Sequence, residues 1–150
     1  MANYDEQIFQ RLEQLRAEIV ANIQAKGITA SGRTQRSLEV VKYDKGVKLI
    51  ANAGDRAPLE TLEVGREGGK VPRGFTDILV QWSHDKGLAF NTERERRTFA
   101  YLLGRKIARS GTERHFFHEN VYTTPVDKAV EDIKRLIIAG VNETIKSYLK

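Results

Sequence analysis

The sequence contains no cysteine, so it can form neither a disulfide framework nor a thiolate metal site. No apolar run approaches the roughly 20 residues that a helix needs to span a bilayer. The N-terminal segment 1–6 is acidic and lacks the cationic start and apolar stretch of a signal peptide. These absences are consistent with a protein that folds in the cytosol.

What remains is the composition of a globular chain. Among 150 residues, 40% are hydrophobic and 30% are charged, which argues against intrinsic disorder. The length suits one domain with its own core, so we expect a single domain over residues 1–150. The sequence contains no internal repeat and no low-complexity segment.

The net charge is +5, and most of the excess lies in one segment. Residues 93–114 contain seven cations and three acids, a balance of +4. Such a local basic patch suits a polyanion or an acidic protein surface, whereas the plainer alternative is a solvated helix face. The sequence leaves both interpretations open. Six of these seven cations, all except Arg114, are assigned to the basic patch: Arg94, Arg96, Arg97, Arg105, Lys106 and Arg109.

Two long amphipathic helices are expected near the ends of the chain. The first covers residues 4–26, where apolar residues recur at steps of three or four. They are Ile8, Leu12, Leu15, Ile19 and Ile23. The second runs from Thr124, a candidate N-cap, to Tyr148. Its apolar stripe, which includes Ile137 and Val141, is wider than one small sheet covers, so we expect an additional packing partner.

Between these helices the pattern predicts strands and then shorter helices. Strands are expected at 38–43 and 47–53, with Asp44-Lys45-Gly46 as a hairpin turn, and a short third strand at 121–123. Helices are expected at 75–86 and 93–110. Their expected buried residues are Ile78, Leu79, Trp82, Phe99, Leu102, Leu103 and Ile107. The fold class is therefore α+β: a small antiparallel sheet packed against a long N-terminal and a long C-terminal helix, with additional helices in the middle.

A glycine-rich loop at 65–73 follows the strand-like run 57–64. Four breakers stand within eight residues, and three cations extend from the same stretch. We interpret it as an interface loop that is mobile and protease-sensitive in the isolated protein and becomes ordered on assembly. The interface candidates of this region are Glu63, Gly65, Arg66, Gly68, Gly69, Lys70 and Arg73, to which Ile137 and Val141 of the last helix are added.

Catalytic and metal-binding patterns are weak. His115 and His118 lie three residues apart, but a metal site needs three or more ligands. Glu60 and Glu63 are more typical of solvated acids at a strand edge than of paired catalytic carboxylates. No serine stands in a nucleophile elbow, and the Gly-Lys-Ser/Thr ending of a phosphate loop is missing. We therefore expect no enzyme, no cofactor and no metal; a toxin-like or nuclease activity using Glu63 and His115 is the weakest alternative.

Three short segments stand out in the order of the expected elements. The first is the small, glycine-containing and basic stretch 31–38, which leads from the first helix into the hairpin. The second is the apolar run 57–65, which ends in Glu-Val-Gly. The third is 107–112, Ile-Ala-Arg-Ser-Gly-Thr. In this order they resemble the tail-completion, or head–tail joining, proteins of the neck of tailed double-stranded DNA bacteriophages, which have Glu-aromatic-Gly at the second segment and Lys-Ile-Ala-Arg-x-Gly-Thr at the third. Val64 and Arg66 depart from the family pattern.

The resemblance implies an α+β fold and a closed homo-oligomeric ring, commonly of six or twelve subunits, that joins the portal side to the tail. Its location would be the virion neck, after synthesis in the bacterial host cytoplasm. Implied partners are copies of itself, neighbouring neck, portal-adaptor and tail proteins, and DNA in the channel, with no membrane. It implies no catalytic residue. The alternative from charge alone is a small basic DNA-binding protein that contacts phosphates through residues 93–114.

Overall fold

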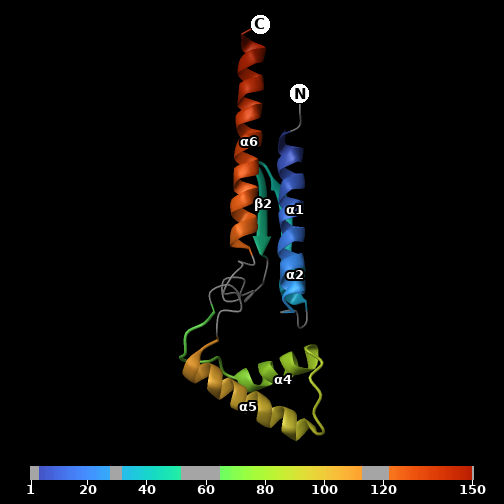
Figure 1. Ribbon diagram of the computed structural model, residues 1–150, viewed down its shortest axis with the longest axis vertical. Helices are drawn as coiled ribbons and strands as arrows, with labels where there is room; N and C mark the ends of the chain where they lie inside the picture. The colour runs from blue at the N-terminus through green and yellow to red at the C-terminus, as the bar shows by residue number, and fades with distance from the viewer. Residues whose placement is uncertain (1–3, 28–31, 52–64, 113–121, 150) are drawn as a thin grey trace.

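The computed structural model describes residues 4–27, 32–51, 65–112 and 122–149. Within these ranges the chain forms five helices and one two-stranded sheet, as shown in Figure 1. The elements are α1 (Tyr4–Ala25), α2 (Arg33–Arg36), β1 (Leu38–Tyr43), β2 (Gly46–Ala51), α4 (Phe75–Asp85), α5 (Glu93–Ser110) and α6 (Thr123–Tyr148). The predicted α+β class, with long terminal helices and a small antiparallel sheet, is confirmed.

α1 forms because its apolar residues return to one face every turn. Leu15, Ile19 and Ile23 are buried, and Gly27 ends the helix with a positive φ of 64°, where the absence of a side chain removes the steric cost. Asp5 and Glu6 in the first turn oppose the positive end of the helix dipole. The predicted helix and its buried stripe are therefore confirmed.

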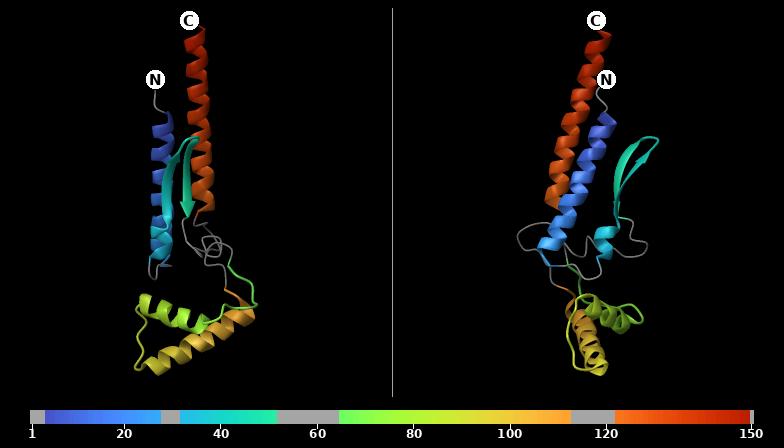
Figure 2. Two further views of the ribbon diagram at one scale, coloured as in Figure 1. Left: turned by 180° about the vertical axis from the view of Figure 1, so that it is seen from behind. Right: turned by 90° about the vertical axis from the view of Figure 1, so that its right-hand side faces the viewer.

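β1 and β2 form an antiparallel hairpin in which Tyr43 pairs with Gly46, so only residues 44 and 45 make the turn. Leu38 and Val40 point to the side that packs on α1 and are buried. Figure 2 shows the hairpin beside α1, with its turn leaning away from the helices in the right-hand view. A lone two-stranded hairpin is marginal in water, so this sheet depends on the helix beneath it.

α1 and α6 run antiparallel and contact each other along much of α1 (Figures 1 and 2). Ala129 is 1% exposed and joins the core formed by α1 and the hairpin. A polar contact lies beside this apolar seam: Arg11 Nε donates to Asp132 Oδ2 at 2.9 Å, and the Arg11 side chain is 10% exposed. Glu18 accepts a second, longer hydrogen bond of 3.4 Å from Arg11.

The α1–α6 pair is also closed near the start of α1. The ring of Tyr4 lies against Gly140, where an added Cβ would approach it to 3.1 Å. A hydrogen bond with Glu143 raises the pKa of Tyr4 above its usual value. At the hairpin, the Lys42 ammonium donates to Glu6 at 2.7 Å and lowers the pKa of that carboxyl.

α4 and α5 form a helical hairpin that lies beyond the end of the α1–α6 pair, at the bottom of Figure 1. Gly104 is buried in this contact, where a Cβ would be in ordinary van der Waals contact with Phe75 and Leu79 at 3.4 to 3.5 Å. Ala100 is fully buried in the same contact. Lys86, after α4, donates to the carbonyl of Gly27 and links this hairpin to the end of α1.

Several predicted details of the middle helices are wrong. Ile78, Phe99 and Leu102 are 45%, 36% and 58% exposed, because α5 meets α4 through the small residues Ala100 and Gly104. Close approach of two helix backbones leaves no room for large side chains at the crossing, so they lie around it.

Two predicted boundaries also differ from the structure. α6 begins at Thr123 with Tyr122 as its N-cap, two residues earlier than the Thr124 cap predicted. The proposed strand at 121–123 is not formed at the two described residues, since Val126 N already donates to Tyr122 O as part of the first helical turn. The remaining residue of that segment lies outside the described ranges.

The contact between α1 and α6 predicts an unequal response of two arginines on α1. Arg11→Ala should lower the free energy of unfolding by about 2–3 kcal/mol, because it leaves Asp132 without its partner in a partly desolvated position. Arg16→Ala, which removes a half-exposed pair with Glu13 on the same helix, should cost less than about 1 kcal/mol, because the Arg16 side chain is 39% exposed and that of Arg11 only 10%. Urea unfolding followed by far-UV circular dichroism measures both. Equal losses for the two variants would contradict the role given to Arg11.

Candidate interaction surfaces

The glycine-rich loop lies along the C-terminal end of α5. Arg66 and Thr112 form an antiparallel bridge with N–H···O distances of 3.0 and 2.8 Å. Gly69 N donates to the carbonyl of Ala108 at 2.7 Å, which satisfies one of the last acceptors of the helix. The loop is therefore held by its own chain, in contrast to the prediction that it becomes ordered only on assembly.

Glycine is required on both sides of this contact. Gly111 has φ 72° and ψ −159°, a conformation that is essentially restricted to glycine, and an added Cβ would lie 1.8 Å from the carbonyl oxygen of Arg66. At Gly68 an added Cβ would lie 2.4 Å from the carbonyl oxygen of Arg109. These glycines serve close backbone packing and not the flexibility expected from the sequence.

The charged members of the loop remain on the surface. Lys70 and Arg73 are exposed, whereas Arg66 folds back and donates to the Lys70 carbonyl. Glu63, the other charged candidate of this region, lies outside the described residues.

The predicted basic patch does not lie on one surface. Arg96 points inward: its guanidinium donates to Ser83 Oγ at 2.9 Å and lies 4.8 Å from the ring centroid of Phe90. Its side chain is 12% exposed, and Glu93 is its acidic partner. Arg96 therefore joins α5 to α4 and to the preceding loop, and sequence spacing alone did not distinguish it from the other cations.

The other five cations of the patch are exposed: Arg94, Arg97, Arg105, Lys106 and Arg109. Arg97 pairs with Asp77 of α4 at 2.9 Å. Arg105 lies 5.9 Å from the ring centroid of Tyr101. Sequence analysis did not place Tyr101 among the cations. Its position beside Arg105 becomes clear only when the exposed face of α5 is known.

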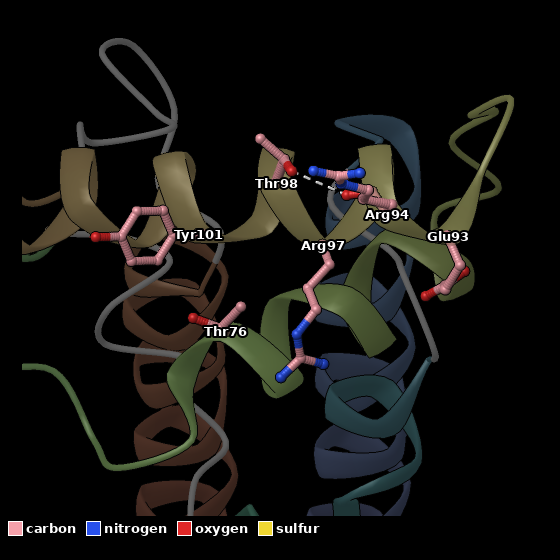
Figure 3. A pocket seen from close by; sticks show the side chains of 6 residues that line it. All are labelled: Thr76, Glu93, Arg94, Arg97, Thr98 and Tyr101. Carbon is pink, nitrogen blue, oxygen red and sulfur yellow. Dashed lines mark hydrogen bonds between the residues drawn. The ribbon is translucent and has the colours of Figure 1, made fainter.

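A shallow groove opens between the start of α4 and the first turns of α5, with a volume of about 530 Å³. Its lining residues, drawn in Figure 3, are Thr76, Glu93, Arg94, Arg97, Thr98 and Tyr101. The Thr98 hydroxyl donates to the carbonyl of Arg94 and is thereby used within the helix. One acid and two cations at an open surface provide no nucleophile with an adjacent base.

Metal ligands do not cluster in the part of the chain that the structure describes: no group of three or more His, Asp or Glu side chains there is arranged to hold an ion. The pair His115 and His118 lies outside those residues. None of the described helices combines the length and apolar character that a membrane crossing requires.

α6 carries a second apolar stripe that nothing in the described chain covers. Its members are Val130, Ile137, Ile138, Val141, Ile145, Tyr148 and Leu149, and they are between 43% and 85% exposed. At about 100° per residue, Val141 lies roughly 120° around the helix from Ala129, which faces α1. The sequence-predicted surplus of apolar residues, including Ile137 and Val141, is therefore an exposed surface that lies beside the covered one.

A further surface on α1 was missed by sequence analysis. The side of α1 that faces away from both α6 and the hairpin bears no charged side chain among seven exposed residues. They are Gln7, Gln10, Gln14, Ala17, Ala21, Gln24 and Ala25. In a chain of which 30% of residues are charged, an exposed helix face usually carries several charges. The sequence shows that these seven positions carry no charge, but this becomes informative only when the structure shows that they form the uncovered face of α1.

The loop–helix contact predicts a difference between two glycines. Gly111→Ala should destabilise the α4–α5 hairpin by at least about 2 kcal/mol, because it adds backbone strain and displaces Arg66. Gly87→Ala should cost only about 1 kcal/mol, since φ is 68° there but no atom lies within 4 Å of the added Cβ. Trp82, the only tryptophan, lies in α4 and reports unfolding of this hairpin by fluorescence. A larger loss for Gly87→Ala would contradict the packing role of Gly111.

Comparison with protein-family models, with curated proteins and with solved structures finds no match for this chain.

Proposed function

We propose that this protein is a structural component of a bacteriophage neck, which forms a homo-oligomeric ring joining the head side to the tail and completing the DNA channel. The observation that carries the proposal is the second apolar stripe of α6. A surface of this kind on a water-exposed helix requires a partner, and a ring supplies one to every subunit.

The exposed area of the chain supports an assembled state. The chain exposes 10861 Å². A compact monomer of 17.0 kDa exposes about 7,700 Å² by the usual scaling of area with mass. The chain therefore leaves about 3,100 Å² more surface uncovered than a compact monomer of this mass does, which favours an assembled state.

The motifs that resemble the neck family give further support. The segment 107–112 and the start of the glycine-rich loop, which follows the second motif, are hydrogen-bonded to each other through Arg66 and Thr112. Gly111, which occupies the family's glycine position, has the conformation and close contact that require glycine. The glycine of the third motif thus has a structural reason to be glycine.

The oligomer predicts the outcome of charged substitutions on α6. The double variant Val141→Glu and Ile145→Glu should weaken self-association by at least about 100-fold, because each side chain loses about 1.5 kcal/mol or more of apolar burial. Multi-angle light scattering behind size exclusion measures the mass, and electron microscopy tests for a ring.

The matched control is Ala139→Glu, which adds a carboxylate at an exposed position of α6 outside the stripe. It should leave the mass of the assembly unchanged, and circular dichroism should show intact helices in both variants. A wild-type chain that remains monomeric at high concentration, alone and with cognate neck proteins, would refute the proposal.

Contact with duplex DNA is a second candidate function, favoured by the five exposed cations of α5. Titration at two salt concentrations should give a slope of log affinity against log salt no steeper than about −4.5, because each of the five cations adds about −0.9 when it contacts a phosphate. Arg105→Ala with Arg109→Ala should reduce the slope by about 2, whereas Lys45→Ala in the hairpin turn should not. Binding that is absent or insensitive to salt removes this candidate.

A further inference from the structure

We propose that the apolar stripe of α6 packs on the uncharged face of α1 of a second copy of this chain. The inference rests on the proposed function, since it identifies the two surfaces that meet between neighbouring subunits. It goes beyond that function because a ring alone does not specify which parts of the fold form the contact.

The uncharged face of α1 is suited to helix packing. Ala17, Ala21 and Ala25 stand at successive four-residue steps, so their methyl groups form a shallow row along the helix. Small side chains let a second helix approach closely, and larger side chains from that helix fill the space above them. The glutamines extend the same face without bringing an unpaired charge into the contact.

The stripe of α6 offers the complementary half. It consists of branched and aromatic side chains, of which Ile138, Val141 and Ile145 follow one another at helical spacing. The 26 residues of α6 span about 39 Å and the 22 residues of α1 about 33 Å, so either helix can cover the other over several turns. One surface is large and apolar, and the other is small and uncharged.

The charges near the two surfaces are mostly paired within the chain. Glu6 and Glu13, beside the uncharged face of α1, pair with Lys42 and Arg16. Lys134 and Glu131, on the first half of the α6 stripe, pair with each other at 2.7 Å. Their charges are therefore balanced before a second copy binds, and the apolar second half of the stripe is the part that lacks a partner.

A second copy fits these observations better than a different protein, because one chain carries both surfaces. Pairing of two α6 stripes with each other would cover the stripe but would leave the α1 face exposed. A contact between α6 and α1 covers both surfaces on every subunit. Because the two surfaces differ, the contact is heterologous, and repetition closes a ring or continues as a filament.

The absence of cysteine makes site-directed cross-linking a direct test. Ala21→Cys and Ile145→Cys are placed on separate chains that are co-expressed, and the purified assembly is treated with a bismaleimide, whose length tolerates a register shift of about one helical turn. We expect a covalent species of twice the chain mass in the mixture and its absence from either variant alone. Ala17→Cys and Ala25→Cys, tested in the same way, determine the register.

Ala139→Cys is the control on α6, because it is exposed but lies outside the stripe. Co-expressed with Ala21→Cys, it should give no cross-link. A chain that carries both Ala21→Cys and Ile145→Cys should give a ladder of products, and its longest member counts the subunits of a closed ring.

The outcomes separate this inference from the proposed ring. Cross-linking of Ile145→Cys with itself, without the mixed product, would replace the inference by a symmetric α6 dimer. An oligomer without either product would mean that the ring uses other surfaces. A mixed cross-link within filaments would support the contact and refute the closed ring, and a monomer would refute both.

Discussion

The contact between α1 and α6 is the interaction on which the described structure depends. The hairpin packs on α1 and is too small to be stable alone, and α6 reaches the same core through Ala129. Arg11 and Asp132 fix how these helices face each other, since both lose hydration there and need each other's charge. When α1 and α6 pack together, one face of each helix is buried, and the other faces that the hairpin does not cover remain exposed to solvent. The outward faces of the molecule are thus a consequence of its main internal contact.

The long helices and the two strands of the hairpin were predicted well from the sequence because each depends on local spacing, whereas the third strand expected at 121–123 does not form at its described residues. Leu15, Ile19 and Ile23 recur at four-residue steps, and Thr92, a residue type that favours the N-cap position, caps α5 by accepting from the Glu95 amide at 3.2 Å. The interior of the α4–α5 hairpin was not predictable in this way. Ala100 and Gly104 are buried because α4 crosses α5 at these residues. Phe99 and Leu102, which were expected to be buried because they are hydrophobic, therefore lie outside the contact and are exposed.

For the interaction surfaces too, features set by local spacing were predicted from the sequence, and features set by tertiary packing were not. The surplus of apolar residues on α6 was visible as a pattern, so Ile137 and Val141 were identified in advance. Arg96 was assigned to a basic surface because the charge of a residue does not show whether its side chain points outward or inward. Its inward contacts with Ser83 and Phe90 depend on tertiary packing. The glycine-rich loop was interpreted as flexible because glycine permits disorder, whereas at Gly68 and Gly111 it permits two backbones to touch.

The bridge between Arg66 and Thr112 brings the two ends of the segment 65–112 together. This segment has its own small core around Ala100 and Gly104, and its entrance and exit are hydrogen-bonded neighbours. A unit with adjacent ends can be gained, lost or replaced without changing the path of the chain on either side of it. The α4–α5 hairpin is thus built so that a change in its length or charge need not alter the α1–α6 pair.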